Sequence, residues 1–177
     1  MQLISVADMQ KTSLTANYVP GRKYVAYDTT VGEVEAIFVK ATGAVGIAGA
    51  PMYPVTASFT VAGGFLVDDN EDGAGVLGQE FCVGSWLGGV TTVANTYGFI
   101  QTKGWNLVTI TTDNSVEALD IVCPSATDGT WYGKDRAELQ TDVSDFPFTR
   151  AGFAPEADGG TTMVLQKVMW DFRQNLV

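Results

Sequence analysis

Short segments in which hydrophobic and polar residues alternate recur from residue 23 onward, at intervals of roughly 8–12 residues. Alternation with period two places successive side chains on opposite faces of a strand. The clearest pair covers residues 23–27 and 34–39, around a turn at 28–32. The second segment carries Val34, Ala36 and Phe38 on one face and Glu33, Glu35 and Ile37 on the other. The pattern predicts an all-β fold, either an antiparallel β-barrel or a β-sandwich.

Further strands are expected over the rest of the chain. They cover residues 59–61, 65–67, 80–87, 97–102, 105–111, 117–123, 148–153 and 162–170. Turn residues separate several of them, at Gly63-Gly64, Lys103-Gly104, 124–129 and 158–160. Within 117–123 the residues on one side are Leu119, Ile121 and Cys123. Two segments keep an alternative: 134–140 fits a short helix although Gly133 favours a loop, and 165–172 fits a helix as well as a strand.

Residues 1–20 are polar and weakly patterned, unlike the chain that follows. Ser5 can cap a helical turn or two between residues 5 and 14. We expect an N-terminal extended arm over residues 1–20, whose order depends on a partner, ahead of one β-domain over residues 21–177. Removal of the arm up to about Gly21 should then leave the domain folded.

Composition supports a folded β-protein. Hydrophobic residues make up 46% and charged residues 17%, which excludes a disordered chain, and 20 glycines suit many short strands joined by turns. The net charge is −10, and residues 41–102 contain no Lys or Arg. Because such a surface repels phosphate backbones, nucleic acid is a poor candidate partner.

The amino-terminal sequence lacks the basic region and apolar core of a signal peptide, and no stretch approaches the roughly 18 apolar residues that cross a bilayer. Cys82 and Cys123 match no metal-ligand spacing. We expect them to be reduced, buried thiols, with a disulfide between them as the alternative. The expected protein is soluble, made in a cytoplasm, and has no membrane partner.

The absence of histidine restricts the available chemistry. It removes the usual general base near neutral pH and every Ser-His-Asp or Cys-His arrangement. Two carboxylates could still support a hydrolase, and the candidate pairs are Asp142 with Asp145 and Asp113 with Glu117. Both pairs lie in segments that also have the character of turns, where acidic side chains are usually solvated. We therefore expect a protein that is not an enzyme.

One acidic segment resembles a calcium loop. Asp68, Asn70, Asp72 and Gly73 match the pattern D-x-[DN]-x-[DN]-G, in which alternating oxygen ligands converge on one hard cation. The twelfth position of the loop is Gln79 instead of a bidentate glutamate, and the flanking residues do not have the pattern of EF-hand helices. An exposed acidic turn is the main interpretation. A weak calcium site at Asp68, Asn70 and Asp72 is the alternative, and no other cofactor is expected.

Two further features have structural explanations. Gly43, Gly46 and Gly49 lie three residues apart, which is not the spacing of a phosphate or dinucleotide loop, and they are expected to allow bulges or close backbone approach. Aromatic side chains can form platforms for sugars, but at alternating strand positions they are more often core. We expect the core interpretation for the four tryptophans, Trp86, Trp105, Trp131 and Trp170.

A series of segments in the second half of the chain occurs in a distinctive order. Residues 97–105 (YGFIQTKGW) precede an apolar strand, the acidic-apolar segment 117–123 and the turn 124–129 (PSATDG). The later segments are 151–154, 156–160 and 162–165. In this order they resemble a pattern of small head proteins of tailed bacteriophages, the β-barrel capsid decoration (cement) proteins. The resemblance covers residues 75–165.

The resemblance implies a structural virion protein that binds the outer surface of a phage capsid and stabilises the lattice of the major capsid protein. It implies no catalytic residues. A mean hydropathy of +0.11 favours a homo-oligomer, and a trimer is favoured because decoration proteins often sit at threefold positions. The expected location is the exterior of the capsid in the virion, after assembly in the host cytoplasm. The alternative is a tail, fibre or host-recognition module that binds glycan.

Overall fold

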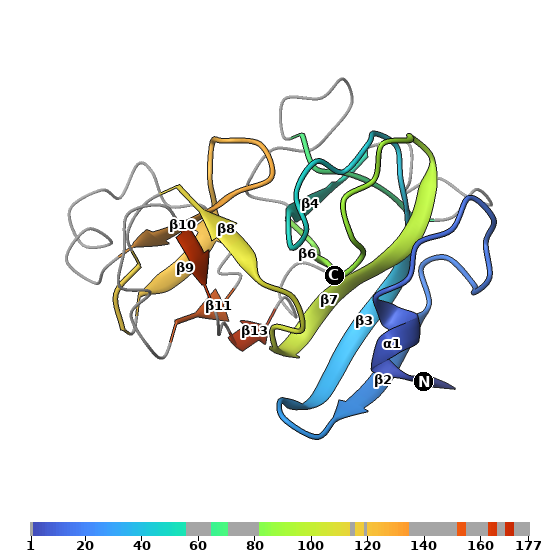
Figure 1. Cartoon of the computed structure of the whole chain (residues 1–177), viewed down its shortest axis with the longest axis horizontal. Helices are drawn as coiled ribbons and strands as arrows, with labels where there is room; N and C mark the ends of the chain where they lie inside the picture. The colour runs from blue at the N-terminus through green and yellow to red at the C-terminus, as the bar shows by residue number, and fades with distance from the viewer. Residues whose placement is uncertain are drawn as a thin grey trace.

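The computed structural model describes residues 2–55, 65–70, 82–113, 116–118, 120–134, 152–154, 163–165 and 169–171. Within these ranges the regular secondary structure is almost entirely strand, with one short helix, α1 (Val6–Met9). The predicted all-β fold is confirmed, and it is a β-barrel with additional strands (Figure 1).

Five strands close the barrel. They are β3 (Gly32–Ala41), β4 (Pro51–Pro54), β5 (Leu66–Asp68), β6 (Gly84–Trp86) and β7 (Thr96–Trp105). Their order is β3-β5-β4-β6-β7, and β7 pairs back onto β3. The β3–β5 pair is parallel, and the other four pairs are antiparallel. Closure satisfies the backbone groups that an open sheet would leave at its edges.

Strands β3 and β7 hold additional strands outside the barrel, because each is 10 residues long. The expected hairpin forms between β2 (Lys23–Asp28) and β3, with Asp28 opposite Gly32. The two-residue strand β1 (Gln2–Leu3) then adds to β2 in parallel.

A second sheet continues from the far end of β7. Its order is β13-β11-β9-β10-β8-β12. The strands are β8 (Ile110–Thr112), β9 (Ile121–Pro124), β10 (Trp131–Lys134), β11 (Gly152–Phe153), β12 (Met163–Leu165) and β13 (Met169–Asp171). Strand β13 joins the second sheet to the barrel by pairing with residues 103–105 of β7.

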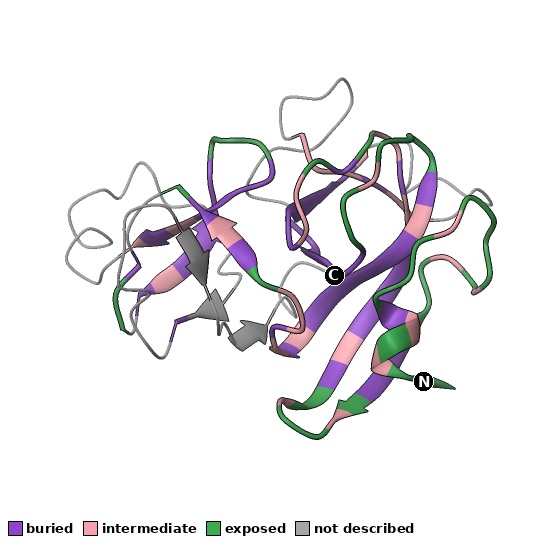
Figure 2. Cartoon of the chain, in the orientation of Figure 1, coloured by how far each residue is buried: buried purple, intermediate pink, exposed green. Residues whose placement is uncertain are grey.

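Among the described residues the buried side chains form three clusters, and Figure 2 marks where along the ribbon the buried residues lie. Each of the five barrel strands contributes a side chain to one cluster, which therefore fills the barrel interior: Ile37, Met52, Val67, Trp86 and Ile100, with their neighbours. A second cluster lies on the outer face of β2, β3 and β7 and includes Val34, Ala36, Phe38 and Phe99. The third cluster joins Tyr53 and Cys82 to side chains of the second sheet. Strand β3 is thus buried on both faces, with the alternation that its sequence predicts.

The N-terminal segment covers the outer face of the barrel. Ser5 caps α1, as expected, and its hydroxyl accepts a hydrogen bond from the Asp8 amide. Met9 is fully buried against the outer cluster, and Ser13 pairs with Tyr97 of β7 through two backbone hydrogen bonds. The division into an arm at 1–20 and a domain at 21–177 stays a prediction, and the contacts of Met9 and Ser13 tie this segment to the barrel.

The predicted tight turn at Lys103-Gly104 is wrong, because both residues lie inside β7. Gly104 has a φ of +93°. Two residues earlier the pairing of β3 with β7 shifts register, since Glu35 pairs with Lys103 and Ala36 pairs with Gln101, so Thr102 is the extra residue of a β-bulge. The chain therefore continues as a strand where the turn was predicted.

Other strand predictions are changed, and the single strand expected at 105–111 is not formed, because β7 ends at Trp105 and β8 begins at Ile110. The expected single strand at 162–170 is two strands, since β12 pairs with β8 whereas β13 pairs with β7 and β11. Residues 131–134 form strand β10 and not a loop, with Gly133 opposite Val122. In β9 the core cluster contains Val122, and Cys123, on the side that it shares with Ile121, is also buried. Residues 59–61 and 135–140, and the turns at 63–64 and 158–160, lie outside the described residues.

Candidate functional site

The acidic segment of the calcium prediction begins in strand β5. Asp68 is the last residue of β5, and its two carboxylate oxygens accept hydrogen bonds from the Thr42 hydroxyl and from the Asn70 amide, the latter at 3.1 Å. The Asp69 carboxylate accepts a bond of 3.1 Å from the Gly46 amide. Asp68 and Asn70 are therefore close together, and Asp72 lies outside the described residues.

The electrostatic environment of this segment is acidic. Burial raises the pKa of the Asp69 carboxyl, the charges of Asp68 and Asp128 raise it further, and the hydrogen bond from Gly46 opposes these effects. No group of three or more Asp, Glu or Cys side chains is placed to hold a metal ion among the residues that the structure describes. The calcium site stays a prediction.

The two carboxylate pairs considered for catalysis lie in different parts of the chain, and the structure describes one of them. Asp113 and Glu117 are both exposed. The Asp113 carboxylate accepts a hydrogen bond from the Ser125 hydroxyl, which fixes the turn after β9. Glu117 donates its backbone amide to Asp120 at 2.8 Å. Asp142 and Asp145 lie outside the described residues.

The glycine-rich segment 43–49 lies between β3 and β4 of the barrel, and its last residue contacts the second sheet. Gly49 has a φ of +77°, and a Cβ atom there would lie 2.7 Å from the Thr109 backbone oxygen. Its own oxygen accepts bonds from the Ser85 hydroxyl at 3.0 Å and from the Trp131 indole at 2.7 Å. Close backbone approach is thus the role of Gly49, as the sequence predicts.

Two of the four tryptophans and both cysteines are core residues, whereas Trp105 is only partly buried and the side chain of Trp170 lies outside the described residues. Trp86 and Trp131 are fully buried, in the barrel interior and in the cluster of the second sheet respectively. Cys82 and Cys123 are buried thiols, and burial raises the pKa of Cys82 to about 12. A thiol with such a pKa is protonated at neutral pH and is a poor nucleophile.

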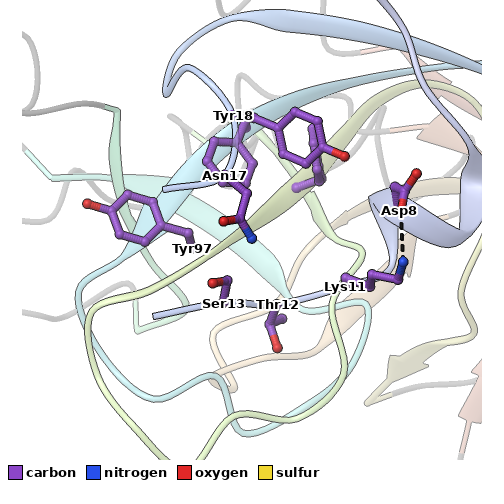
Figure 3. A pocket seen from close by; sticks show the side chains of 9 residues that line it. Asp8, Lys11, Thr12, Ser13, Asn17, Tyr18 and Tyr97 are labelled. Atoms are coloured by element: carbon purple, nitrogen blue, oxygen red, sulfur yellow. Dashed lines mark hydrogen bonds and ion pairs between the residues drawn. The ribbon is translucent and has the colours of Figure 1, made fainter. Parts of the chain in front are cut away.

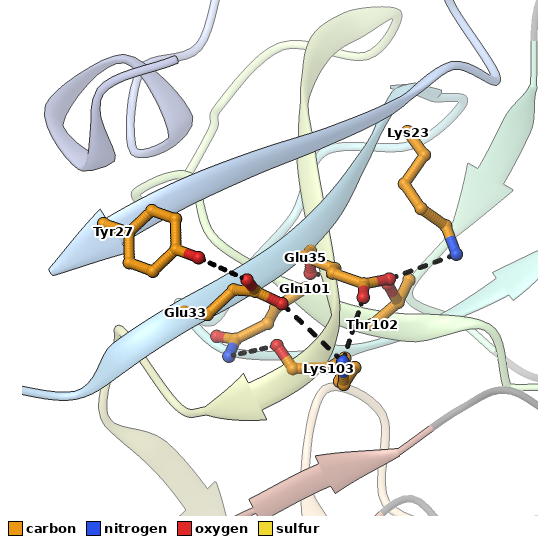
Figure 4. A network of polar contacts seen from close by, with 7 residues as sticks. All are labelled: Lys23, Tyr27, Glu33, Glu35, Gln101, Thr102 and Lys103. Atoms are coloured by element: carbon orange, nitrogen blue, oxygen red, sulfur yellow. Dashed lines mark hydrogen bonds and ion pairs between the residues drawn. The ribbon is translucent and has the colours of Figure 1, made fainter. Parts of the chain in front are cut away.

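A network of charged side chains crosses strands β2, β3 and β7 (Figure 4). The Glu35 carboxylate lies 3.1 Å from the ammonium groups of both Lys23 and Lys103. Burial raises the pKa of Glu35, but the hydrogen bonds and charges of Lys103 and Lys23 outweigh it, so the pKa lies below the ordinary value. Tyr27 donates a hydrogen bond of 2.7 Å to Glu33 at the end of the network. The network fixes strand register.

A hollow of about 200 Å³ opens between the N-terminal segment and the outer face of the barrel (Figure 3). Polar side chains come from the N-terminal segment, and aromatic side chains come from Tyr18, β3 and β7. Its lining is Asp8, Lys11, Thr12, Ser13, Asn17, Tyr18, Phe38, Tyr97 and Phe99. The sequence did not predict this site, because its lining comes from segments up to about ninety residues apart. The local signal in the N-terminal segment was its polar character with one tyrosine.

Three exposed apolar side chains belong to segments that adjoin the lining of this hollow. The segment around Ser13 pairs with Tyr97, and Thr12 lies against Gly88, so residues 12–14 run alongside the loop between β6 and β7. The apolar rim, as we name it, consists of Leu14, Val90 and Val93, which are 67%, 61% and 51% exposed.

Comparison with known proteins identifies no relative: the chain matches no protein-family model, no curated protein and no solved structure at a significant level. None of the described helical residues forms a segment with the length and apolar character of a membrane span.

Proposed function

We propose that this chain is a structural virion protein that binds the outer surface of a phage capsid and stabilises the lattice of the major capsid protein. The carrying observation is the apolar rim, where Leu14, Val90 and Val93 are more than half exposed. Exposed apolar side chains on adjacent segments are available for protein contacts. The ordered resemblance over residues 75–165 supplies the identity of the partner.

The closed barrel suits this role. β3 and β7 share seven paired positions, and both faces of β3 are buried, so the loop that carries Val90 and Val93 projects from a rigid frame. A rigid contact surface loses little conformational entropy on binding. The net charge of −10 would keep the outward surface soluble and would repel nucleic acid. These properties also agree with a protein that is not an enzyme and that assembles as a homo-oligomer, for which a trimer is proposed.

Two measurements test the proposal. Mass spectrometry of purified virions of the encoding phage should detect the chain, and electron microscopy should show added density on the exterior of heads incubated with it. Leu14→Asp and Val90→Asp should reduce head binding. Leu3→Asp is the matched control, since Leu3 is 69% exposed in β1, away from the rim, and the same charge is added. Virions without the protein, or heads that stay bare at saturating excess, would contradict capsid attachment.

A second candidate is a tail, fibre or host-recognition module that binds glycan. The hollow with its aromatic and polar lining favours this function. Trp86 and Trp131 are buried and do not form a sugar platform, so the aromatic surface would be that of Tyr18 and Tyr97. Location on the virion separates the two candidates, because a host-recognition module lies on the tail or fibres and a decoration protein lies on the head.

A further inference from the structure

We propose that the hollow between the N-terminal segment and the outer face of β3 and β7 binds a neutral sugar ring. This site lies beside the apolar rim and uses different side chains, so the proposal stands or falls independently of capsid attachment. If the second candidate function is correct, this hollow is its binding site.

Aromatic rings form the floor and one wall of the hollow. Phe38 and Tyr97 are stacked, with ring centroids 5.8 Å apart and an angle of 13° between their planes. Tyr18 meets Phe38 and Phe99 edge to face, at 5.3 and 5.2 Å. Phe38 and Phe99 are buried, whereas Tyr18 and Tyr97 are partly exposed, so ring surface is available to a ligand. The C–H groups of a pyranose form an apolar face that packs on such rings.

Polar side chains with unused hydrogen-bonding capacity line the other side. Figure 3 shows the Asn17 amide between Tyr18 and Tyr97, with Ser13 and Thr12 below it. Among the described residues the Asn17 amide and the Thr12 hydroxyl have no hydrogen-bond partner, and the same holds for the hydroxyls of Tyr18 and Tyr97. An amide and several hydroxyls offer donors and acceptors together, which matches the hydroxyl groups around a sugar ring.

The charges at the hollow favour a neutral ligand. Lys11 and Asp8 form an ion pair of 2.7 Å, so one positive and one negative charge are paired at its edge. Hydrogen bonds from Lys11 and Ser5 lower the pKa of Asp8, and the bond to Asp8 raises the pKa of Lys11, so both stay ionised at neutral pH. A cation would be repelled by the ammonium group of Lys11. It would also be repelled by that of Lys40, which lies 5.7 Å from the centre of the Tyr97 ring. An anion would meet a protein of net charge −10.

The volume of the hollow limits the ligand to a small one. About 200 Å³ is below the range of roughly 300–1,000 Å³ that is usual for drug-sized ligands, which suits a single ring. A longer glycan would place one residue in the hollow and leave the others in solvent. Affinity for a monosaccharide is accordingly expected in the millimolar range, about 1 mM.

Amide NMR titration of the full chain with methyl glycosides of glucose, galactose, mannose and N-acetylglucosamine tests this proposal. At least one glycoside should shift the signals of Ser13, Asn17 and Tyr97 and leave those of the Glu35 network in place. Asn17→Ala and Tyr18→Ala should weaken that binding by about tenfold, because each removes a contact to the ligand. Tyr18→Phe, which keeps the ring, should retain most of the affinity.

Tyr27→Ala is the matched control, since Tyr27 is an exposed tyrosine of β2 that does not line the hollow. Its binding should equal that of the unmodified chain. The proposal is overturned if no glycoside of the panel shifts signals at the hollow and a glycan array is also silent. It is overturned as well if tetramethylammonium or inorganic phosphate binds there more tightly than every glycoside, or if Tyr27→Ala weakens binding as much as Tyr18→Ala.

Discussion

The indole Nε1 of Trp131 donates a hydrogen bond of 2.7 Å to the backbone oxygen of Gly49. Trp131 belongs to β10 of the second sheet, and Gly49 belongs to the loop between β3 and β4 of the barrel. Both residues are buried, and the same oxygen accepts a bond from Ser85 of β6. One carbonyl group therefore connects strand β6 of the barrel to the second sheet.

Trp131→Phe should lower the free energy of unfolding by about 1–2 kcal/mol, because the ring is largely kept while a buried hydrogen bond is lost. Urea unfolding followed by circular dichroism measures the change. Trp105→Phe is the control, since Trp105 is only partly buried and its indole makes no hydrogen bond within the described residues. An unchanged midpoint for Trp131→Phe would show that the bond to Gly49 contributes nothing to stability.

Gly104→Ala should destabilise the barrel strongly. The residue has a φ of +93°, and an added Cβ would collide with the backbone oxygen of Glu33. A residue with a Cβ atom is strained at this φ, and β3 would have to move away from β7 there. Gly46→Ala is the matched control, because an added Cβ there meets no atom within 4 Å and φ is not in the left-handed region. Thermal melts should show a large decrease for Gly104→Ala alone; equal melting temperatures for the two variants would contradict a requirement for glycine at this position.

The Glu35 network should make stability depend on pH in the acid range. The folded-state pKa of Glu35 lies below its ordinary value of 4.5, so the unfolded chain binds a proton first as pH falls. The stabilisation is present above pH 4.5 and is lost as pH decreases through the lower folded-state pKa. Glu35→Gln should therefore be destabilised near neutral pH and should show a flatter decline on acidification.

Denaturant midpoints measured at a series of pH values check this expectation. Glu117→Gln removes the same charge at an exposed position and should leave the pH profile unchanged. If Glu35→Gln and the unmodified chain decline in parallel, the two lysines do not stabilise the ionised form of Glu35.

Calcium, if it binds near Asp68, should stabilise the folded chain. A bound cation near Asp68 would counteract the charges and the burial that raise the pKa of Asp69, and ligand binding to the folded state raises its stability. If the calcium prediction is correct, millimolar calcium should give heat in a calorimetric titration and raise the melting temperature, and Asp68→Asn should remove both effects. Magnesium is the control. No heat and no shift would leave an acidic turn as the interpretation.

Removal of residues 1–20 tests whether the N-terminal segment is a separable arm. The barrel interior contains no side chain from before Ile37, so the five-stranded barrel should still form. Its outer face would lose Met9 and expose Phe38 and Phe99, so the midpoint should decrease. Met9→Ala should reproduce part of that loss, about 2–5 kcal/mol. A truncated chain as stable as the full one would confirm an independent arm, and an unfolded one would show that the segment belongs to the domain.

Local patterns predicted the parts of the fold that depend on neighbouring residues. The β2–β3 hairpin follows from alternation and a turn sequence, and the cap at Ser5 follows from its side chain. Lys103-Gly104 shows the limit of this approach. The same glycine permits a turn or a left-handed residue within a strand, and only the pairing of β7 with β3, which is distant in sequence, selects the strand.

The candidate site could be predicted only where its residues are neighbours in sequence. Asp68 and Asn70 form a local motif, and their proximity was expected. The hollow brings Asn17 and Tyr18 to Tyr97, and nothing in either segment specifies the other. The apolar rim depends in the same way on the pairing of Ser13 with Tyr97. Sites built by such long-range pairing require the fold before they can be recognised.

Closure of the barrel has a consequence for the order of folding during synthesis. All five barrel strands lie within the first 105 residues of the chain, and so does every side chain of the barrel interior. The barrel can therefore close while the ribosome is still making the remainder, since N-terminal units fold first during translation. The end of β7 then stays unpaired until β13 has been made, and β13 is synthesised last of all the described strands. A nascent chain stalled before β13 should carry a finished barrel with one unpaired strand end, and that end is the place where a chaperone or a neighbouring chain would act.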